Sequence, residues 1–180
     1  MEQPRPTVAE IVVKTAVTHT VTYFIMGLLA VIIFDYAHLY ADTSLNLLMR
    51  PINEPLVMAG PLFQPIRGAL FGLVFYLLRE PLFGKQNGWL VLWALLGVIG
   101  IAGTFGPAPG SIEGLIYTIL PLRVHLKGLP EVVIQALFLS GMLYYWVNHR
   151  AKKWLNWVMG TGFFIVLLLP SLGLWVGQSN

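Results

Sequence analysis

The chain contains no cysteine among its 180 residues. This absence excludes disulfides, thiolate metal sites, iron–sulfur clusters and thiol redox chemistry. Charge is scarce as well, because only 11% of the residues are charged, whereas a soluble domain carries about a quarter. The formal net charge of +3 is small, and no basic run suits a nucleic acid. A chain with so little charge cannot cover a water-facing surface of its own size.

Motifs with a defined catalytic spacing are missing too. No histidine has the HExxH spacing that places two imidazoles and a base on one helix face. The segment Gly110-Ser111-Ile112-Glu113-Gly114 has residues of the serine-hydrolase pattern G-x-S-x-G in the wrong order, and we expect Ser111 to cap a helix instead. The sequence has neither a Walker loop nor a dinucleotide fingerprint. Nothing in it points to an enzyme, and neither a metal nor a cofactor is predicted.

Long apolar runs are abundant, and 57% of the residues are hydrophobic. A helix that crosses about 30 Å of hydrocarbon needs roughly 20 mostly apolar residues. Backbone groups cannot stay unpaired in lipid, so such runs are expected to be helical. We predict an all-α integral membrane protein that forms one multi-pass domain over residues 1–180 within the lipid bilayer. Its five predicted transmembrane helices cover residues 11–36, 56–78, 88–106, 130–148 and 154–176.

The positions of the lysines and arginines predict the orientation of these helices. One side of the membrane collects seven of them and the other side three, while Arg67 lies in or near the second span. Because the cytoplasmic side carries the excess of Lys and Arg, we expect a cytoplasmic N-terminus and an outer C-terminus, in the cell (inner) membrane. The seven are Arg5, Lys14, Arg79, Lys85, Arg150, Lys152 and Lys153, and the three are Arg50, Arg123 and Lys127.

Two segments on the predicted outer side are unusual. Residues 37–65 contain four prolines, and residues 107–129 begin with a Gly/Pro-rich turn. Each segment includes an apolar piece, Leu56–Phe63 or Ile112–Leu122, that is too short to span and too apolar for an ordinary loop. Broken helices are tolerated at membrane depth only where they pack on protein or line a wet cavity. We therefore expect two re-entrant half-helices or, alternatively, two segments that lie flat at the outer interface.

Small residues recur at helical spacing in three of the predicted spans, and in the fourth span they are Ala136 and Ser140. Gly68 and Gly72 form a GxxxG pair in the second span, and Gly97, Gly100 and Gly103 follow one another at intervals of three in the third. Small residues promote helix association in lipid because they let two backbones approach closely. These faces either pack the chain against itself or form an interface with a membrane-protein partner or a second copy.

The first span carries a polar face formed by Thr15, His19 and Thr22. A threonine can bond a carbonyl one turn back, so the threonines need no further partner. An ionisable residue within a span is expected to point into the bundle, where His19 either bonds a neighbouring helix or handles a proton or solute. Ligation of haem b by His19 is a less favoured alternative, because His38, 19 residues away, lies about 28 Å further along a helix.

An ionic group is expected near the second span. Arg67 falls near the middle of that apolar run, where an arginine costs about 2.5–3.5 kcal/mol on insertion scales. We therefore expect Arg67 to face an acid or water, with Glu113 as its predicted partner and Arg123 as a further cation on the outer side. If a half-helix ends near Pro65, Arg67 instead begins the true span near the outer boundary.

Glu131 is explained without a functional role. It follows Pro130, and proline is favourable at the first position of a helix. Glu131 is therefore expected in the first turn of the fourth span, where a negative charge suits the helix dipole.

Three functions remain open. The favoured one is a non-enzymatic protein that binds a small polar or anionic solute at its outer face, for recognition or transport, since a guanidinium binds carboxylate or phosphate in two-pronged fashion. The alternative is an accessory or assembly subunit of a larger membrane complex, and the third is electron transfer through haem b. The predicted ligand-binding residues are Arg67, Glu113 and Arg123, with His19 and Thr22 at the inner end.

Overall fold

The computed structural model describes residues 6–34, 50–51 and 54–178. His38 and most of the predicted first outer segment lie outside these residues. Within them every regular element is a helix, which confirms the predicted all-α class. The elements are α1 (Val8–Phe34), α3 (Pro55–Met58), α4 (Gly60–Leu77), α5 (Arg79–Phe83), α6 (Gly88–Ala94), the π-helix η1 (Leu95–Ala102), α7 (Ile112–Tyr117), α8 (Leu122–Asn148) and α9 (Lys153–Gln178).

Three of the described helices are long and apolar enough to cross a membrane. They cover Val8–Ile33, Leu122–Asn148 and Lys153–Trp175, and Gly88–Ala102 is a shorter apolar helix. Large apolar side chains on them face outward: Trp157 and Trp175 of α9 are 78% and 71% exposed. Such side chains suit a hydrocarbon surrounding and would be costly in water. Three of the predicted spans thus correspond to helices that could cross a membrane.

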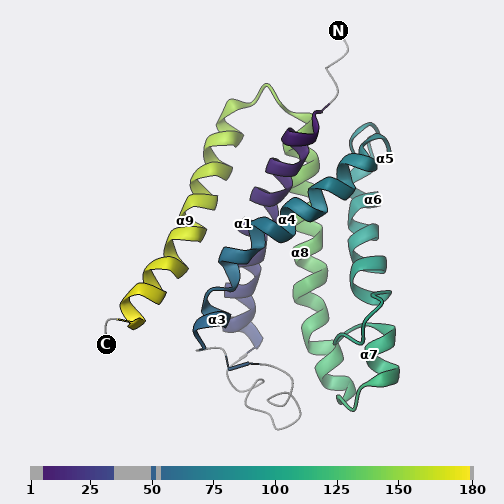
Figure 1. Ribbon diagram of the computed structural model, residues 1–180. Helices are drawn as coiled ribbons and strands as arrows, with labels where there is room; N and C mark the ends of the chain where they lie inside the picture. The colour runs from purple at the N-terminus through teal and green to yellow at the C-terminus, as the bar shows by residue number, and fades with distance from the viewer. Residues whose placement is uncertain (1–5, 35–49, 52–53, 179–180) are drawn as a thin grey trace.

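The helices form a bundle in which successive elements reverse direction. In Figure 1, α1 runs from the N-terminal end of the bundle to the opposite end, and α4 returns alongside it. The pair α6–η1 then leads away from the N-terminal end, α8 leads back, and α9 leads away again. The N-terminus, α5 and the α8–α9 connection therefore share one end, whereas α3, α7 and the C-terminus share the other.

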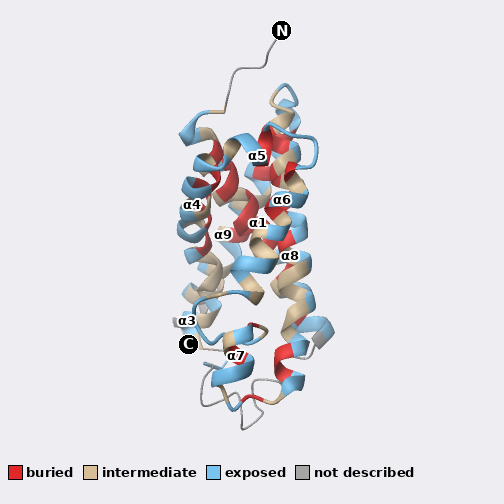
Figure 2. Ribbon diagram, turned by 90° about the vertical axis from the view of Figure 1, so that its right-hand side faces the viewer, coloured by how far each residue is buried: buried red, intermediate tan, exposed pale blue. Residues whose placement is uncertain are grey.

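The interior of the bundle is built around α1, which packs on α4, α8 and α9. Figure 2 shows the buried stretches on the inward sides of these helices and exposed stretches on their outward sides. An apolar cluster near the N-terminal end joins α1, α4, α5, α6 and α8 through Ile11, Phe75, Leu82, Leu92 and Leu143. This cluster holds one end of the bundle together, and the polar residues described below lie further along α1.

The α1–α4 contact depends on the glycine pair of α4. A Cβ added at Gly68 would lie 2.6 Å from Cα of Ala16, and one added at Gly72 would lie 2.6 Å from Cα of Val12. No side chain fits at either position, so the two backbones approach through the glycines. The GxxxG face is therefore occupied within the chain itself. By contrast, a Cβ at Gly97 or Gly100 of η1 would meet nothing within 4 Å.

Two prolines lie inside helices where the sequence predicted a boundary. The expectation that Pro130 is the first residue of a helix is wrong, because α8 begins at Leu122 and contains Pro130. Pro65 likewise lies inside α4, and the chain breaks earlier, at Ala59 between α3 and α4. Proline removes one backbone donor, yet membrane helices tolerate it where neighbouring groups take up the freed carbonyl.

The two predicted half-helices correspond to shorter elements. α3 has four residues and leads directly into α4, so Leu56–Phe63 is divided between these helices. α7 has six residues, and the backbone is extended at Thr118 and again at Pro121 before α8 begins. Ser111 caps α7 as predicted, since its hydroxyl accepts the Gly114 amide at 2.9 Å. Both elements lie at the end of the bundle opposite the N-terminus (Figure 1).

Candidate functional site

A cavity of about 470 Å³ lies between α1, α4, η1 and α8. This volume is within the range of small-molecule sites. Its apolar wall includes Phe71 of α4, Leu96 and Ile101 of η1, and Leu139 of α8. The polar residues that line it come from four parts of the chain: His19, Tyr23, Arg67, Thr104, Glu131 and Gln135. A largely apolar hollow with a few convergent polar groups is the usual form of a ligand site.

His19 is the polar residue that the bundle buries most fully in this wall, at 2% exposure. Its Nε2 lies 3.1 Å from Oε1 of Gln64, and its ring meets the edge of the Phe71 ring at 5.1 Å between centroids. The Gln64 amide nitrogen donates to the Gly60 carbonyl at 3.2 Å. The amide oxygen of Gln64 therefore faces His19, and the Nε2 proton of the neutral imidazole donates to it.

That arrangement leaves the second imidazole nitrogen of His19 as an acceptor. Nδ1 of His19 is buried and has no hydrogen-bond partner in the structure. A buried polar atom without a partner costs free energy and is uncommon in native proteins. Nδ1 itself is shielded from solvent, although other atoms of His19 line the cavity. Because Nε2 is engaged by Gln64, a metal or haem would have to approach His19 through Nδ1.

The polar face of α1 is explained largely by bonds within the helix. The hydroxyls of Thr15, Thr18 and Thr22 donate to carbonyls one turn back, with distances of 2.7–2.8 Å. Thr22 is buried, but it is not among the residues that line the cavity. His19 alone of the predicted polar face reaches both a neighbouring helix and the cavity. His19 lies against α4 because the two helices approach closely at Gly68, where an added Cβ would lie 3.1 Å from Cβ of His19.

Arg67 of α4 is among the residues that line the cavity, and it is an exposed residue. Its guanidinium carbon lies 5.4 Å from the centroid of Phe71, which lines the same cavity. This cation–π contact holds the head group against an apolar wall. The acid that lines the cavity with Arg67 is Glu131 of α8.

The structure brings together two of the five predicted site residues. His19 and Arg67 line the cavity, whereas Thr22, Glu113 and Arg123 are not among its lining residues. Glu113 lies half-buried in the first turn of α7, and Arg123 is exposed at the start of α8. The described ion pairs do not join Arg67 to Glu113, and the acid that shares a cavity with Arg67 is Glu131.

Sequence reasoning missed several residues of the site. Glu131 was explained as a first-turn acid, but with α8 beginning at Leu122 it lies well inside the helix, where the dipole does not account for it. Gln135 follows one turn later on the same helix and lines the cavity beside it. Spacing carried a signal, since Tyr23 follows His19 and Gln135 follows Glu131 by four residues, which places each pair on one helix face.

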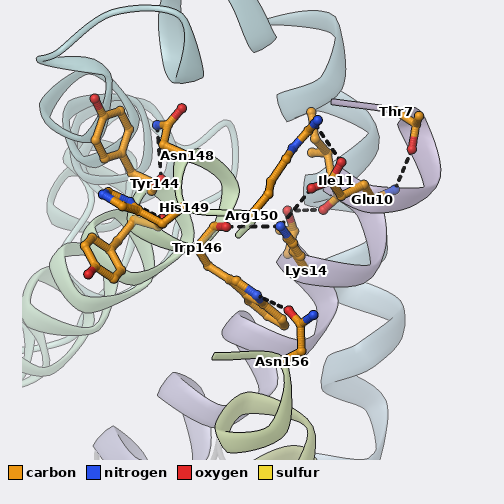
Figure 3. Close-up of polar contacts among 12 residues, drawn as sticks. Thr7, Glu10, Ile11, Lys14, Tyr144, Trp146, Asn148, His149, Arg150 and Asn156 are labelled. Carbon is orange, nitrogen blue, oxygen red and sulfur yellow. Dashed lines mark hydrogen bonds and ion pairs between the residues drawn. The ribbon is translucent and has the colours of Figure 1, made fainter. Parts of the chain in front are cut away.

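A second polar cluster joins α1, α8 and α9 at the N-terminal end (Figure 3). Glu10 of α1 pairs with Lys14 at 2.8 Å and with Arg150, beyond the end of α8, at 2.7 Å. The Lys14 ammonium also donates to the Trp146 carbonyl at 3.0 Å, and the Trp146 indole donates to Asn156 of α9 at 2.8 Å. These bonds tie the first helix to the last two. We therefore interpret the cluster as structural.

A second buried histidine among the described residues also has a structural place. His125 of α8 accepts the Gly110 amide on Nδ1 at 3.0 Å and faces the Thr118 hydroxyl on Nε2 at 3.4 Å. Gly110 has φ +87°, a conformation that a glycine adopts without strain. His125 thereby anchors the turn before α7 to α8. Within the described ranges, no group of three potential metal ligands occurs.

Comparisons with family models, with curated proteins and with solved structures find no match to this chain.

Proposed function

We propose that this chain is a five-span membrane protein that binds a small polar solute in the cavity between α1, α4, η1 and α8, for recognition or transport. One observation carries the proposal: His19, buried and with Nδ1 unpartnered, borders a cavity that also holds Arg67 and Glu131. Polar and ionisable groups inside a membrane bundle are expensive, and they usually mark a path or site for a solute. A bundle that needed only packing would fill this space with apolar side chains.

The proposed count of five spans adds α4 and the α6–η1 pair to the three long helices. α4 has 18 residues, which correspond to about 27 Å at 1.5 Å per residue, close to the thickness of the hydrocarbon. Each of these elements leads from one end of the bundle to the other between helices that do the same (Figure 1). Broken or irregular helices occur at membrane depth where they line a cavity, as η1 does here.

The distribution of charge supports an N-terminus in the cytoplasm. The segments 79–87 and 149–153, which share the N-terminal end of the bundle, contain Arg79, Lys85, Arg150, Lys152 and Lys153. The opposite end receives the segments with Arg50, Arg123 and Lys127. Under the positive-inside rule, the end of the bundle that holds α3 and α7 then faces outward.

The first experiment asks whether the cavity is wet and whether Arg67 is needed. Because the chain has no cysteine, Thr104→Cys places a single thiol in the cavity wall. We expect a small charged methanethiosulfonate reagent to modify it in purified, monodisperse protein. We also expect a panel of amino acids, carboxylates, amines and sugars at millimolar concentration to include members that raise the melting temperature.

Arg67→Leu should abolish that thermal shift, while the variant still inserts and elutes as a single species. Arg50→Gln is the matched control, because Arg50 pairs with Glu54 outside the cavity. An unreactive thiol at position 104, together with the lack of any stabilising solute, would refute a solute site in this cavity. An unchanged shift in the Arg67 variant would remove Arg67 from the site.

An accessory subunit remains the second candidate, and one observation favours it. A Cβ added at Gly97 of η1 would meet nothing within 4 Å, and Val98 and Ile99 beside it are exposed. This smooth, apolar face would accept a helix of a partner protein. Gentle detergent extraction with a tag after Asn180, followed by mass spectrometry, decides between the two. A stoichiometric partner would favour the accessory subunit, and a lone monodisperse protein would favour the solute site.

A further inference from the structure

The end of the bundle that holds α7 and the start of α8 exposes a group of large apolar side chains (Figure 1). We call six of them the outer apolar patch: Ile112, Leu115, Ile116, Ile119, Leu122 and Leu126. The most exposed is Ile119, between the two helices, at 92%. The other members lie three or four residues apart within α7 and within the first turns of α8, so each set follows one helix face. Exposed apolar surface gathered in one place marks a contact with a membrane or a partner.

The patch belongs to a segment that is held in place by bonds beneath it. The Gly110 amide donates to Nδ1 of His125 at 3.0 Å, and the Thr118 hydroxyl donates to the Gly114 carbonyl at 2.7 Å. Leu120, between α7 and α8, is buried and supplies an apolar contact of the segment's own. The segment thus has inward-facing groups that fix it on α8, and the patch is the surface that it leaves outside.

The length of α8 places the patch at a defined depth under the proposed topology. α8 has 27 residues, which correspond to about 40 Å at 1.5 Å per residue, whereas the hydrocarbon is about 30 Å thick. The polar residues His149 and Arg150 follow its C-terminal end directly and suit one boundary of the membrane. About 20 residues counted back from Asn148 reach Gly128. The first turns of α8, and α7 with them, therefore lie at the level of the outer headgroups.

The polar neighbours of the patch suit that layer. Arg123 and Lys127 are exposed, and each directly follows a patch residue on α8. Tyr117 of α7 is exposed as well, and tyrosine is enriched where headgroups meet acyl chains. Glu113 is the single acid of residues 110–127. Cations beside apolar side chains complement a layer of lipid phosphates above acyl chains.

We infer that the outer apolar patch docks on the outer leaflet of the bilayer, with its side chains among the upper acyl chains and Lys127 at the lipid phosphates. This lipid contact goes beyond the solute site. It assigns α7 a surface of its own, because α7 is too short to span the membrane and packs on α8 with its other side.

Single cysteines make the docking measurable, because the chain has none of its own. Ile116→Cys, labelled with the fluorophore NBD, is reconstituted as the full chain in vesicles of phosphatidylcholine and phosphatidylglycerol. Gln86→Cys, exposed between α5 and α6, is the reference for water, and Ile165→Cys, exposed within α9, is the reference for hydrocarbon. At position 116 we expect the strongest quenching from a lipid with a doxyl group near its headgroup. Quenching there by aqueous acrylamide should be at least about threefold weaker than at position 86.

A charge reversal tests the contact with phosphates. Lys127→Glu should raise acrylamide quenching at position 116, because phosphates repel the new carboxylate, and more phosphatidylglycerol should enlarge the rise. Lys127→Gln should give a smaller rise. Lys153→Glu is the matched control, since this exposed cation lies at the start of α9, at the other end of the bundle, and its reversal should leave position 116 unchanged. Gel filtration before reconstitution establishes that each variant is folded.

Four outcomes would overturn the inference. Acrylamide quenching at position 116 equal to that at position 86 would place the patch in water. Quenching mainly by a doxyl group near the chain end, as at position 165, would place it in the hydrocarbon. Shielding from all quenchers that is lost when the protein is diluted with lipid would show that a second copy covers the patch. An unchanged signal in Lys127→Glu would remove the phosphate contact. None of these results alters the thiol reactivity at position 104 or the thermal shift, so the solute site is judged separately.

Discussion

Polar side chains inside this apolar bundle fall into two groups with different energetic consequences. The threonine hydroxyls of α1 donate to carbonyls of their own helix, so these hydrogen bonds do not depend on any other helix. His19 and Gln64 bond across the α1–α4 contact, and Lys14 bonds across from α1 to α8. Only the second group depends on the packing of the bundle, and only there does the loss of one partner leave a polar atom buried and unpaired.

The His19–Gln64 bond gives a residue-scale prediction. Gln64→Leu should lower the free energy of unfolding by about 0.6–2 kcal/mol, because Nε2 of His19 loses its acceptor in an apolar surrounding. Urea or SDS titration, followed by circular dichroism, measures the change. Thr20→Val is the control, since the buried Thr20 hydroxyl donates within α1 to the Ala16 carbonyl. Equal costs for the two substitutions would contradict a special role of the cross-helix bond.

The cluster around Glu10 gives a second residue-scale prediction. Glu10→Gln removes the carboxylate that Lys14 and Arg150 share, and leaves two cations close together at the end of the bundle. Because the three side chains are 11–24% exposed, the effect is screened in part, and we expect a loss of about 1–3 kcal/mol. Thermal unfolding of the detergent-solubilised protein measures it. Glu54→Gln, in an exposed pair, should cost at most about 0.5 kcal/mol.

At this scale the sequence predicted which residues are unusual better than it predicted their partners. His19 and Arg67 stand out because a polar side chain within an apolar run is costly. The partner of Arg67 was expected on α7, but the acid in its cavity lies on α8, which follows α7 after a turn. Spacing along one helix fixes neighbours on that helix. Which helices then meet is decided by packing that no local pattern contains.

At the scale of helix contacts, alanine substitutions at a glycine of α4 and at a glycine of η1 can be compared. Gly72→Ala should destabilise the protein by about 1–3 kcal/mol, because the added Cβ meets the α1 backbone at 2.6 Å and forces the helices apart. Gly97→Ala should be neutral or stabilising, since nothing lies within 4 Å and alanine favours a helix. Thermal melting compares them. A loss at Gly97 that occurs only in native membranes would instead reveal a bound partner.

Helix boundaries at the prolines could not be derived from the sequence. Proline ends a helix in water often enough that Pro65 and Pro130 were natural limits. In α4 and α8 the helix continues through them, because in lipid an interrupted helix loses backbone bonds that no water can replace. The π-helical turns of η1 were not foreseen either. Their i→i−5 bonding, seen where the Gly103 amide donates to Val98, depends on how η1 packs and lacks a sequence signature.

The topology of the whole molecule is open to a direct test, because every introduced thiol is the only one. Phe105→Cys, fully exposed between η1 and α7, should react with a membrane-impermeant maleimide added to intact cells. Gln86→Cys and Ala151→Cys, at the N-terminal end of the bundle, should react only after the cells are opened. The cysteine-free parent is the blank. The reverse pattern would invert the proposed orientation, and labelling of all three from outside would contradict five spans.

As a membrane bundle the molecule was largely predictable. Apolar runs are a property of composition along the chain, and α1, α8 and α9 follow from them directly. The shape of the cavity was not predictable, because it depends on four segments far apart in sequence. The helices that line it are arranged by tertiary contacts, such as the glycine contact of α1 with α4.

The place of α9 has a consequence for how the protein is made. Every residue that lines the cavity precedes α9, and α9 packs on α1, α3 and α4. A chain that leaves the ribosome from its N-terminus thus has all the walls of the cavity in the membrane once α8 has entered. Before α8 is made, the wall of the cavity that contains Glu131 and Gln135 is absent, although His19 is already present. We therefore expect the cavity to assemble late in synthesis, when only α9 remains to be added.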